Sequence, residues 1–469
     1  MSAIGDRIRA LPERYGKATL ILLAAILVLG LGLRAYRVAE PLATPGDDAR
    51  AYYALSKALY EEGSYGEPGE FRDSSDWSPG APLLYAAAFY ATGGPREGVG
   101  RIVEALLGVV AIVVVFLLAN RLAGAASGRG PNRSDPGGWL SGSAAGLIAA
   151  FAVAVYPPFI HSTGALMSEP PAIFTLPAAV LAFLWASERE RLRAWLLPGL
   201  LFGLTALIRP EYLLVAVAFA LLAAFRVGTA RGWRPGLAGA GLFTVALLLP
   251  IVPWTVRNAI VLDRTVPIST GGGKALYVGT YLPADGEYQR VKALLVERYL
   301  GRDLEPGSEA LDRVDPAPLF DRVAARYPDL PRDSALGKIG KENLSEYLGD
   351  DPLGYAGMTV RKVWRMWSGG IGEAMSSGIG RVVQVLIVLL GLAGLVLLAL
   401  RARWWDLVAL ATPIVLVTAV GAASLAASRR NEVLMTLIFP LAALALSSAV
   451  AAISSGRRWS PSQASSPPN

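Results

Sequence analysis

The chain has 469 residues, of which 53% are hydrophobic and 17% are charged, and its mean hydropathy is +0.43. Soluble domains carry about 25% charged residues, and the apolar residues here come in runs such as IVEALLGVVAIVVVFLLA, so we expect a multi-pass membrane protein rather than a soluble globule. The sequence has no cysteine, one histidine and a net charge of +7 without a basic and aromatic cluster, which excludes disulfides, thiolate or multi-histidine metal sites and a nucleic-acid partner.

Apolar stretches of about 20 residues, the length that crosses a bilayer, predict about ten transmembrane helices. Single spans are expected at 18–36, 99–119, 139–157, 167–186, 236–253, 380–400, 404–423 and 433–453. The stretch 194–225 is too long for one span and has Arg209, Pro210 and Glu211 at its middle, so we expect two short helices joined by this turn. The run 79–92 is too short for a span and is predicted to be interfacial or re-entrant.

The basic residues of the loops predict the orientation. Alternate loops carry arginine groups, for example at 189–193 and 401–403, as cytoplasmic loops do. We therefore expect both termini in the cytoplasm and the intervening polar stretches on the outer face of the cytoplasmic membrane. The predicted domains are a cytoplasmic tail (1–17), a transmembrane core (18–253) that includes the first outer loop 37–97, an extracytoplasmic domain (254–378), C-terminal transmembrane helices (379–453) and a disordered cytoplasmic tail (454–469).

The expected fold class is an all-α polytopic membrane protein, with interfacial helices in the first outer loop and a small α or α+β extracytoplasmic domain. The spans themselves are almost free of charge, so the chemistry is expected where polar residues gather at the outer face.

Carboxylates open two of the predicted outer helices. Asp47 and Asp48 begin GDDARAYYALSKAL, where they either stabilise a helix N-terminus or supply a general base for a hydroxyl nucleophile near the membrane. Glu169, in MSEPPAIF, sits at the outer start of the fourth predicted span and is either a first-turn glutamate or a second carboxylate that faces the same cavity and holds an acceptor or a divalent ion. Asp76 and Trp77 precede the short apolar run and are assigned to the acceptor or the cavity wall, although Trp77 alone is also typical of an interfacial anchor.

The single histidine, His161, lies in the turn before Glu169. It is assigned to the cavity, with an ordinary polar role as the alternative. Asp47, Glu169 and His161 are also the candidate ligands of a divalent cation (Mg, Mn or Ca). One histidine and two carboxylates do not select a metal, so no cofactor is assigned.

Four arginines on the predicted outer face run against the positive-inside trend. Guanidinium groups bind phosphate, so we expect these residues to hold the phosphate of a lipid-linked substrate, with Glu211 lining the same cavity. The alternative is that each arginine pairs with Glu211, with Glu432 or with lipid headgroups. The four are Arg209, Arg257, Arg429 and Arg430.

Lys274 follows three glycines in VPISTGGGKALYVGT. The segment lacks the glycine spacing and the Ser or Thr after the lysine that a nucleotide phosphate loop requires. Its glycines are instead expected to permit a close approach of the backbone to another surface. Lys274 is added to the residues expected near the substrate phosphate.

Together, GDDARAYYALSKAL, SPGAPLLY, MSEPPAIF, LIRPEYLL and PWTVRNAIVLDRTVPISTGGGKALYVG resemble motifs of the GT-C membrane glycosyltransferases, a group that includes protein O-mannosyltransferases, aminoarabinose transferases and the RgtA/B/C/D-like enzymes. The resemblance extends to SRRNEVLMTLIFPLAALAL. It implies transfer of a sugar, with inversion, from a polyprenyl-phosphate donor to a lipid, protein or polysaccharide acceptor of the cell envelope. Asp47 matches the family's general base, Asp48 the second acid, and Glu169 a position where the family often has Asp.

Two other functions stay open at this point. One is a lipid-linked glycan ligase or flippase, and the other is a secondary transporter. A transporter places ionisable residues near the bilayer midplane and often has repeated halves. The spans here have almost no charge at their centres, which favours surface chemistry over passage.

Overall fold

The computed structural model describes residues 15–40, 47–66, 75–126 and 142–456. All regular structure in these residues is helical, which confirms the predicted all-α class. Most of the two predicted cytoplasmic tails lies outside the described residues.

Within the described residues, eight helices are long and apolar enough to cross a membrane, and two shorter apolar helices accompany them. The eight are α3 (Lys17–Ala39), α6 (Glu97–Ala126), α9 (Glu169–Ala186), α11 (Tyr212–Arg231), α12 (Trp233–Leu262), α20 (Gly378–Leu400), α21 (Trp404–Ala423) and α22 (Ser428–Gly456). The shorter two are α7 (Gly142–Val155) and α10 (Leu196–Ile208), with the 3-10 turn η1 (Leu192–Trp195) before α10. These helices correspond in order to the predicted spans, although α12 continues past residue 253.

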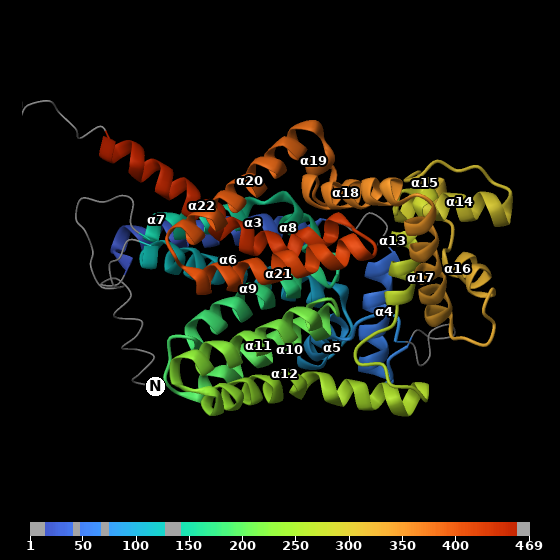
Figure 1. The fold of residues 1–469 in the computed structure, drawn as a ribbon, viewed down its shortest axis with the longest axis horizontal. Helices are drawn as coiled ribbons and strands as arrows, with labels where there is room; N and C mark the ends of the chain where they lie inside the picture. The colour runs from blue at the N-terminus through green and yellow to red at the C-terminus, as the bar shows by residue number, and fades with distance from the viewer. Residues whose placement is uncertain (1–14, 41–46, 67–74, 127–141, 457–469) are drawn as a thin grey trace, which may run out of the picture.

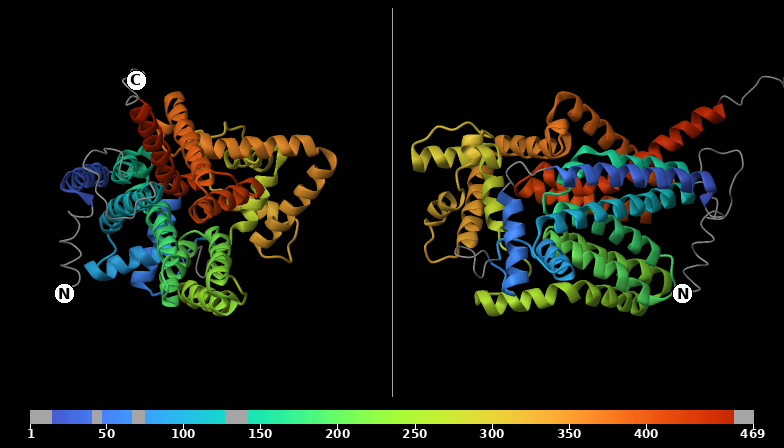
Figure 2. Two further views of the ribbon diagram at one scale, coloured as in Figure 1. Left: turned by 60° about the vertical axis from the view of Figure 1, so that its left-hand side comes forward. Right: turned by 180° about the vertical axis from the view of Figure 1, so that it is seen from behind.

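The remaining helices lie between the spans. The first outer loop forms α4 (Asp47–Glu61) and α5 (Gly80–Thr92), and α8 (Pro157–Ser162) precedes α9. The second polar stretch forms α13 (Gly272–Thr280), η2 (Leu282–Ala284), α14 (Tyr288–Leu300), α15 (Glu309–Asp312), α16 (Ala317–Ala324), α17 (Arg332–Asp350), α18 (Pro352–Ser368) and α19 (Glu373–Ser376). Helices α13 to α17, which we call the polar domain, have a hydrophobic core of their own and lie beyond one end of the helix bundle, with α4 beside them (Figures 1 and 2).

Two helices form the centre of the bundle. In both α9 and α22, 78% of the most apolar 18-residue stretch of the helix is buried inside the protein, compared with 11% in α3 and 22% in α20. Helix α22 packs on α6, α7, α9 and α20. Because a helix that faces lipid keeps apolar residues exposed, α3 and α20 are peripheral, whereas α9 and α22 are enclosed by protein.

Arginine-rich loops gather at the end of the bundle opposite the polar domain. Arg121 pairs with Asp406 and with Glu188, both at 2.5 Å, and Arg403 pairs with Asp406 at 2.7 Å. The guanidinium of Arg231 donates to the carbonyl oxygen of Arg189 at 2.9 Å. These contacts join loops that the charge pattern assigned to a single face.

Lys362 of α18 joins the polar domain to the bundle. Its side chain is fully buried, and its Nζ donates to the carbonyl oxygens of Gly279 in α13 (2.7 Å) and Ala422 in α21 (2.8 Å). Arg361, the residue before it, donates from Nε to Asp285 Oδ1 at 2.9 Å. A lysine that neutralises two carbonyl dipoles in this way fixes the relative position of α13 and α21.

The Lys362 amine predicts a pH dependence of stability. Burial lowers its pKa from 10.5 to about 8, so between these pH values the unfolded chain holds a proton that the folded chain does not. The contribution of this group to the free energy of unfolding therefore increases as the pH rises from about 8 to 10.5 and decreases as the pH falls through the same range. We expect Lys362→Met to remove this gain, measured as the change in thermal midpoint between about pH 7 and about pH 9.5. Lys341→Met, at an exposed lysine, is the control, and an unchanged gain in Lys362→Met would contradict the prediction.

Candidate active site

Glu169 is the centre of an ion-pair network at the first turn of α9. Its side chain is 1% exposed, and Oε1 lies 3.0 Å from Nη1 of Arg209 and 2.8 Å from Nε of Arg429. The hydroxyl of Ser168 donates to Oε2 at 3.3 Å. Two prolines follow Glu169, and they suit a first turn because their missing N–H groups would have no partner there. The buried carboxylate is thus held by two cations from distant segments.

Arg209 ends α10 in an extended conformation, with φ −140°. It also pairs from Nε with Glu211 Oε1 at 3.0 Å, so the alternative that it pairs with Glu211 is correct. The first outer loop reaches the same place, because the Ser78 hydroxyl donates to the carbonyl oxygen of Ile208 at 2.6 Å. A Cβ on Gly80 would lie 2.6 Å from the Ile208 nitrogen, so only glycine permits this approach.

Arg429, in the first turn of α22, connects two of the predicted acids. Its guanidinium contacts Glu169 and also forms an ion pair with Asp48 Oδ2. Helix α4 begins at Asp47, but the side chain of Asp47 lies outside the described part of the structure. Asp48 and Glu169 are therefore brought to one guanidinium, as expected of acids that line one site.

Arg430 differs from its neighbour. It is half-buried, and its one side-chain hydrogen bond within the described residues runs from Nη1 to the Ser424 hydroxyl at 3.3 Å. No ion pair of Arg430 is found in the described part of the chain, whereas Arg209 and Arg429 each contact two carboxylates. Arg430 is thus the arginine of this network whose charge is least compensated by the protein.

The other two predicted phosphate ligands lie among aromatic rings. Arg257 donates from Nη2 to the carbonyl oxygen of Tyr65 at 3.0 Å, and its guanidinium lies 5.1 Å from the ring centre of Trp254. The Lys274 ammonium lies 4.8 Å from the ring centre of Phe320, and burial lowers its pKa. Such cation–π contacts stabilise the charge without a phosphate, so the surroundings of Arg257 and Lys274 differ from those of the arginines near Glu169.

Asp76 holds the first outer loop against the polar domain. The Thr270 hydroxyl donates to Oδ1 at 2.5 Å, and Nη2 of Arg332 in α17 pairs with Oδ2 at 2.5 Å. Trp77, next in sequence, packs edge-on against Tyr52 of α4 with ring centres 5.3 Å apart. His161 is exposed and its ring lies against Gly372.

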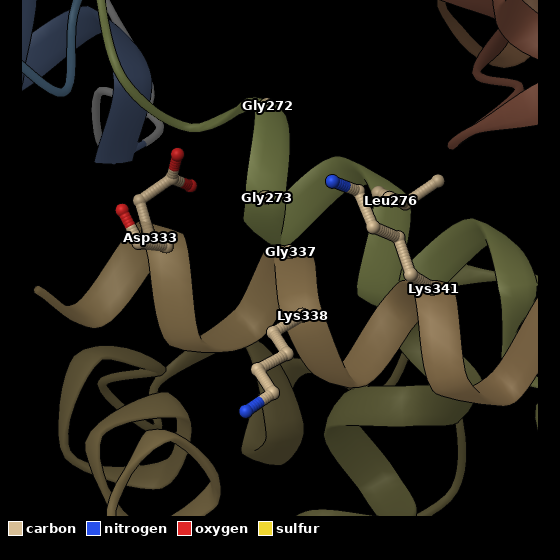
Figure 3. A pocket seen from close by; sticks show the side chains of 8 residues that line it. Gly272, Gly273, Leu276, Asp333, Gly337, Lys338 and Lys341 are labelled. Carbon is tan, nitrogen blue, oxygen red and sulfur yellow. The ribbon is translucent and has the colours of Figure 1, made fainter. Parts of the chain in front are cut away.

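The three glycines before Lys274 lie where α13 crosses α17. A Cβ on Gly273 would come 1.8 Å from the carbonyl oxygen of Asp333, so the expected close approach is present. The Asp333 carboxylate also accepts the backbone N–H of Lys274 at 3.0 Å. A groove of about 520 Å³ lies over this crossing, and Figure 3 shows Asp333 at one end of it and Lys341 at the other.

Two residues near the site, Tyr52 and Glu104, were not predicted, and Glu432 was named only as a possible partner of the arginines. Tyr52 of α4 is 4% exposed; burial raises its pKa, and its hydroxyl lies near Ser168. Glu432 is 1% exposed, and neither of its carboxylate oxygens has a hydrogen-bond partner in the described part of the chain. Glu104 is fully buried in α6. Tyr52 could have been found from its four-residue spacing from Asp48, which places both residues on one helix face. Glu104 could have been found because it is a lone acid within an apolar span.

The described positions of the candidate metal ligands do not form a metal site. Among the described residues, no three carboxylate or histidine side chains gather as metal ligands would. Of the candidate ligands, Glu169 is engaged by two arginines, His161 is exposed, and the Asp47 side chain is not among those described.

The family model of dolichyl-phosphate-mannose-protein mannosyltransferases matches residues 139–254, which include Glu169, Arg209 and Glu211. No curated protein is significantly similar to the chain. Among solved structures, the oligosaccharyltransferase of Archaeoglobus fulgidus in the apo form aligns with a TM-score of 0.54 at 17% identity, over 96% of this chain and 52% of the other. The archaeal oligosaccharyltransferase AglB from Archaeoglobus fulgidus, in complex with an inhibitory peptide and a dolichol-phosphate, gives a TM-score of 0.52 at 16% identity over the same shares.

ArnT from Cupriavidus metallidurans bound to undecaprenyl phosphate gives a TM-score of 0.38 at 13% identity, over 94% of this chain and 81% of the other. The chain spans about half the length of the oligosaccharyltransferase structures that it matches. At these identities the likeness concerns the fold alone, and the chain shares the fold of the aligned part of these oligosaccharyltransferase structures.

Proposed function

We propose that the chain is a membrane glycosyltransferase, which transfers a sugar with inversion from a polyprenyl-phosphate donor to an acceptor on the outer face of the cytoplasmic membrane. The observation that carries the proposal is the network of Glu169, Arg209, Arg429 and Asp48, with Arg430 beside it, which has no ion pair among the described residues. It lies at the outer ends of the two most enclosed helices, where a lipid headgroup and a water-soluble acceptor meet.

The charges of the network support a lipid phosphate as the leaving group. Arg209 and Arg429 are balanced by carboxylates, so the cation with charge to offer a phosphate is Arg430. When the bond from the sugar to the phosphate breaks, the departing phosphate gains negative charge, and a fixed guanidinium stabilises it. The similar AglB structure, determined with a dolichol-phosphate, supports this ligand chemistry.

We assign the general base to Asp47. Asp48 is held in an ion pair with Arg429, which restrains its carboxylate. Asp47 is the neighbouring acid at the start of the same helix. It would take the proton of the acceptor hydroxyl as the oxygen attacks the anomeric carbon, opposite the departing polyprenyl phosphate, and this geometry inverts the configuration.

The difference between the two ends of the bundle supports one orientation of the protein in the membrane. The arginine-rich loops at one end support a cytoplasmic location for that end and for both termini. The polar domain would then be extracytoplasmic, where it can cover the site and contact the acceptor through α13 and α17. The apolar helices around the site would hold the polyprenyl chain.

A transfer assay tests the proposal. Membranes containing the protein would receive polyprenyl-phosphate mannose with a radiolabelled sugar, a donor chosen because of the matching mannosyltransferase model. We expect label in the acceptor fraction and release of polyprenyl phosphate, while a labelled nucleotide sugar gives no transfer. Polyprenyl phosphate alone should also raise the thermal midpoint of the purified protein, because a ligand that binds the folded state stabilises it. Absence of both effects with mannosyl and other glycosyl donors would contradict the proposal.

The likeness to an oligosaccharyltransferase favours one alternative, a ligase that moves a preassembled glycan. The mass added to the acceptor separates the two: one sugar for the proposed reaction, several for the ligase. Comparison of lipid extracts and envelope polymers from a deletion strain and its parent would give that mass directly.

A further inference from the structure

The turn that carries Ser168 and Glu169 has an unusual backbone. Within residues 163–168, Gly164 has φ 90° and Leu166 has φ 50°. The left-handed region suits glycine, whereas a leucine there is strained. Since the turn sits directly before the acid on which two arginines converge, something outside the turn must hold it in place.

Glu104 of α6 makes the contacts that hold this turn. Its carboxylate is fully buried; Oε2 accepts the backbone N–H of Gly164 at 2.6 Å, and Oε1 accepts that of Met167 at 2.9 Å. The Tyr85 hydroxyl lies 2.6 Å from Glu104 Oε1 and 2.6 Å from the Met167 carbonyl oxygen. Two backbone donors on either side of Leu166 are therefore bound by one side chain.

The side chain of Leu166 packs against the same face of α6. Gly100 lies one helical turn before Glu104, and a Cβ on it would come 2.9 Å from the Leu166 side chain. Arg101 lies beside Gly164, and its Nη2 donates to the carbonyl oxygens of Arg37 (3.0 Å) and Glu40 (2.9 Å). The strained leucine is thus held by packing as well as by its neighbours' hydrogen bonds.

A carboxylate in an apolar span is costly unless its oxygens are bonded. Here two of the bonds go to one short turn and a third comes from the Tyr85 hydroxyl of α5, which also contacts that turn, and this is more than packing of α6 requires. We infer that Glu104 is a positioning residue of the proposed glycosyltransferase site: it fixes the 163–168 turn, and so sets where Glu169 meets Arg209 and Arg429, without touching the substrate. This inference rests on the proposed function for its kinetic consequence, but not for the contact itself.

Glu104→Gln tests the inference, because either orientation of an amide turns an NH₂ group toward a backbone N–H and breaks one of the two bonds. Glu97→Gln, at an exposed acid in the first turn of the same helix, is the matched control. We expect faster hydrogen exchange at the amides of Gly164 and Met167 and a turnover number lower by about 10-fold or more. The Michaelis constant for the donor should change less than about threefold, since Arg430 is on another helix.

Tyr85→Phe is the second variant, and we expect it to lower the turnover number by a smaller factor. It replaces Glu104→Gln in the test if Glu104→Gln does not accumulate as folded protein. Unchanged exchange in the turn would overturn the inference. Faster exchange with normal turnover per folded molecule would also overturn it, since the turn would then be held for stability alone. If the wild-type protein transfers no sugar, the proposed function fails, while the exchange measurement still decides whether Glu104 holds the turn.

Discussion

Asp47→Asn is expected to lower the turnover number by about 10²–10⁴-fold, the range for loss of a general base. The amide has nearly the shape of the carboxylate but cannot accept a proton at neutral pH. Donor binding should be retained, because the phosphate is assigned to Arg430. The measurement is sugar transfer at saturating donor, together with the thermal shift produced by polyprenyl phosphate.

Asp48→Asn is the matched control for this variant. Asp48 forms an ion pair with Arg429, so its loss should act through that arginine and reduce turnover by about tenfold at most. Turnover at the wild-type rate in Asp47→Asn would remove Asp47 from the mechanism. The reverse order, with Asp48→Asn the more damaged variant, would assign the base to Asp48 instead.

The fold could be predicted from local features of the sequence. Apolar length gave the spans, and the single interruption at Arg209 to Glu211 correctly divided the long stretch into α10 and α11. Both signals depend on residues that are adjacent in the chain. The end of α12 was misjudged because PWTVRN is polar enough to leave a membrane yet still continues the helix to Leu262.

The partners of the charged residues could not be predicted in the same way. Arg429 and Arg430 are adjacent and look equivalent in sequence, but only Arg429 faces Asp48 and Glu169. Their pairing depends on which side of α22 faces α9 and α4, and this is set by packing of segments hundreds of residues apart. For the same reason the contact of Lys274 with Phe320 left no trace in the local motif, whereas Trp254 does precede Arg257 in PWTVRN.

The difference in pairing makes Arg430 and Arg209 behave differently when replaced. Arg430→Ala removes a cation whose one hydrogen bond in the described chain is to Ser424, so the fold should be little affected. A charge-assisted bond to phosphate contributes about 1.5–3 kcal/mol, and each 1.4 kcal/mol is about tenfold in affinity. We therefore expect the Michaelis constant for the donor to rise by about 10–100-fold, with a thermal midpoint close to that of the wild type.

Arg209→Ala should instead damage the protein itself. It removes a cation that contacts both Glu169 and Glu211, and a buried carboxylate left without its partner costs about 3–5 kcal/mol. We expect a marked fall in thermal midpoint and little folded protein, measured by fluorescence-detected chromatography and melting in detergent. If both variants keep a normal midpoint and lose donor affinity equally, the carboxylates do not compensate Arg209, and the phosphate would be held by both arginines. If Arg430→Ala instead binds the donor normally, the phosphate must be held elsewhere, and the ammonium of Lys274 beside Phe320 is the next cation to replace.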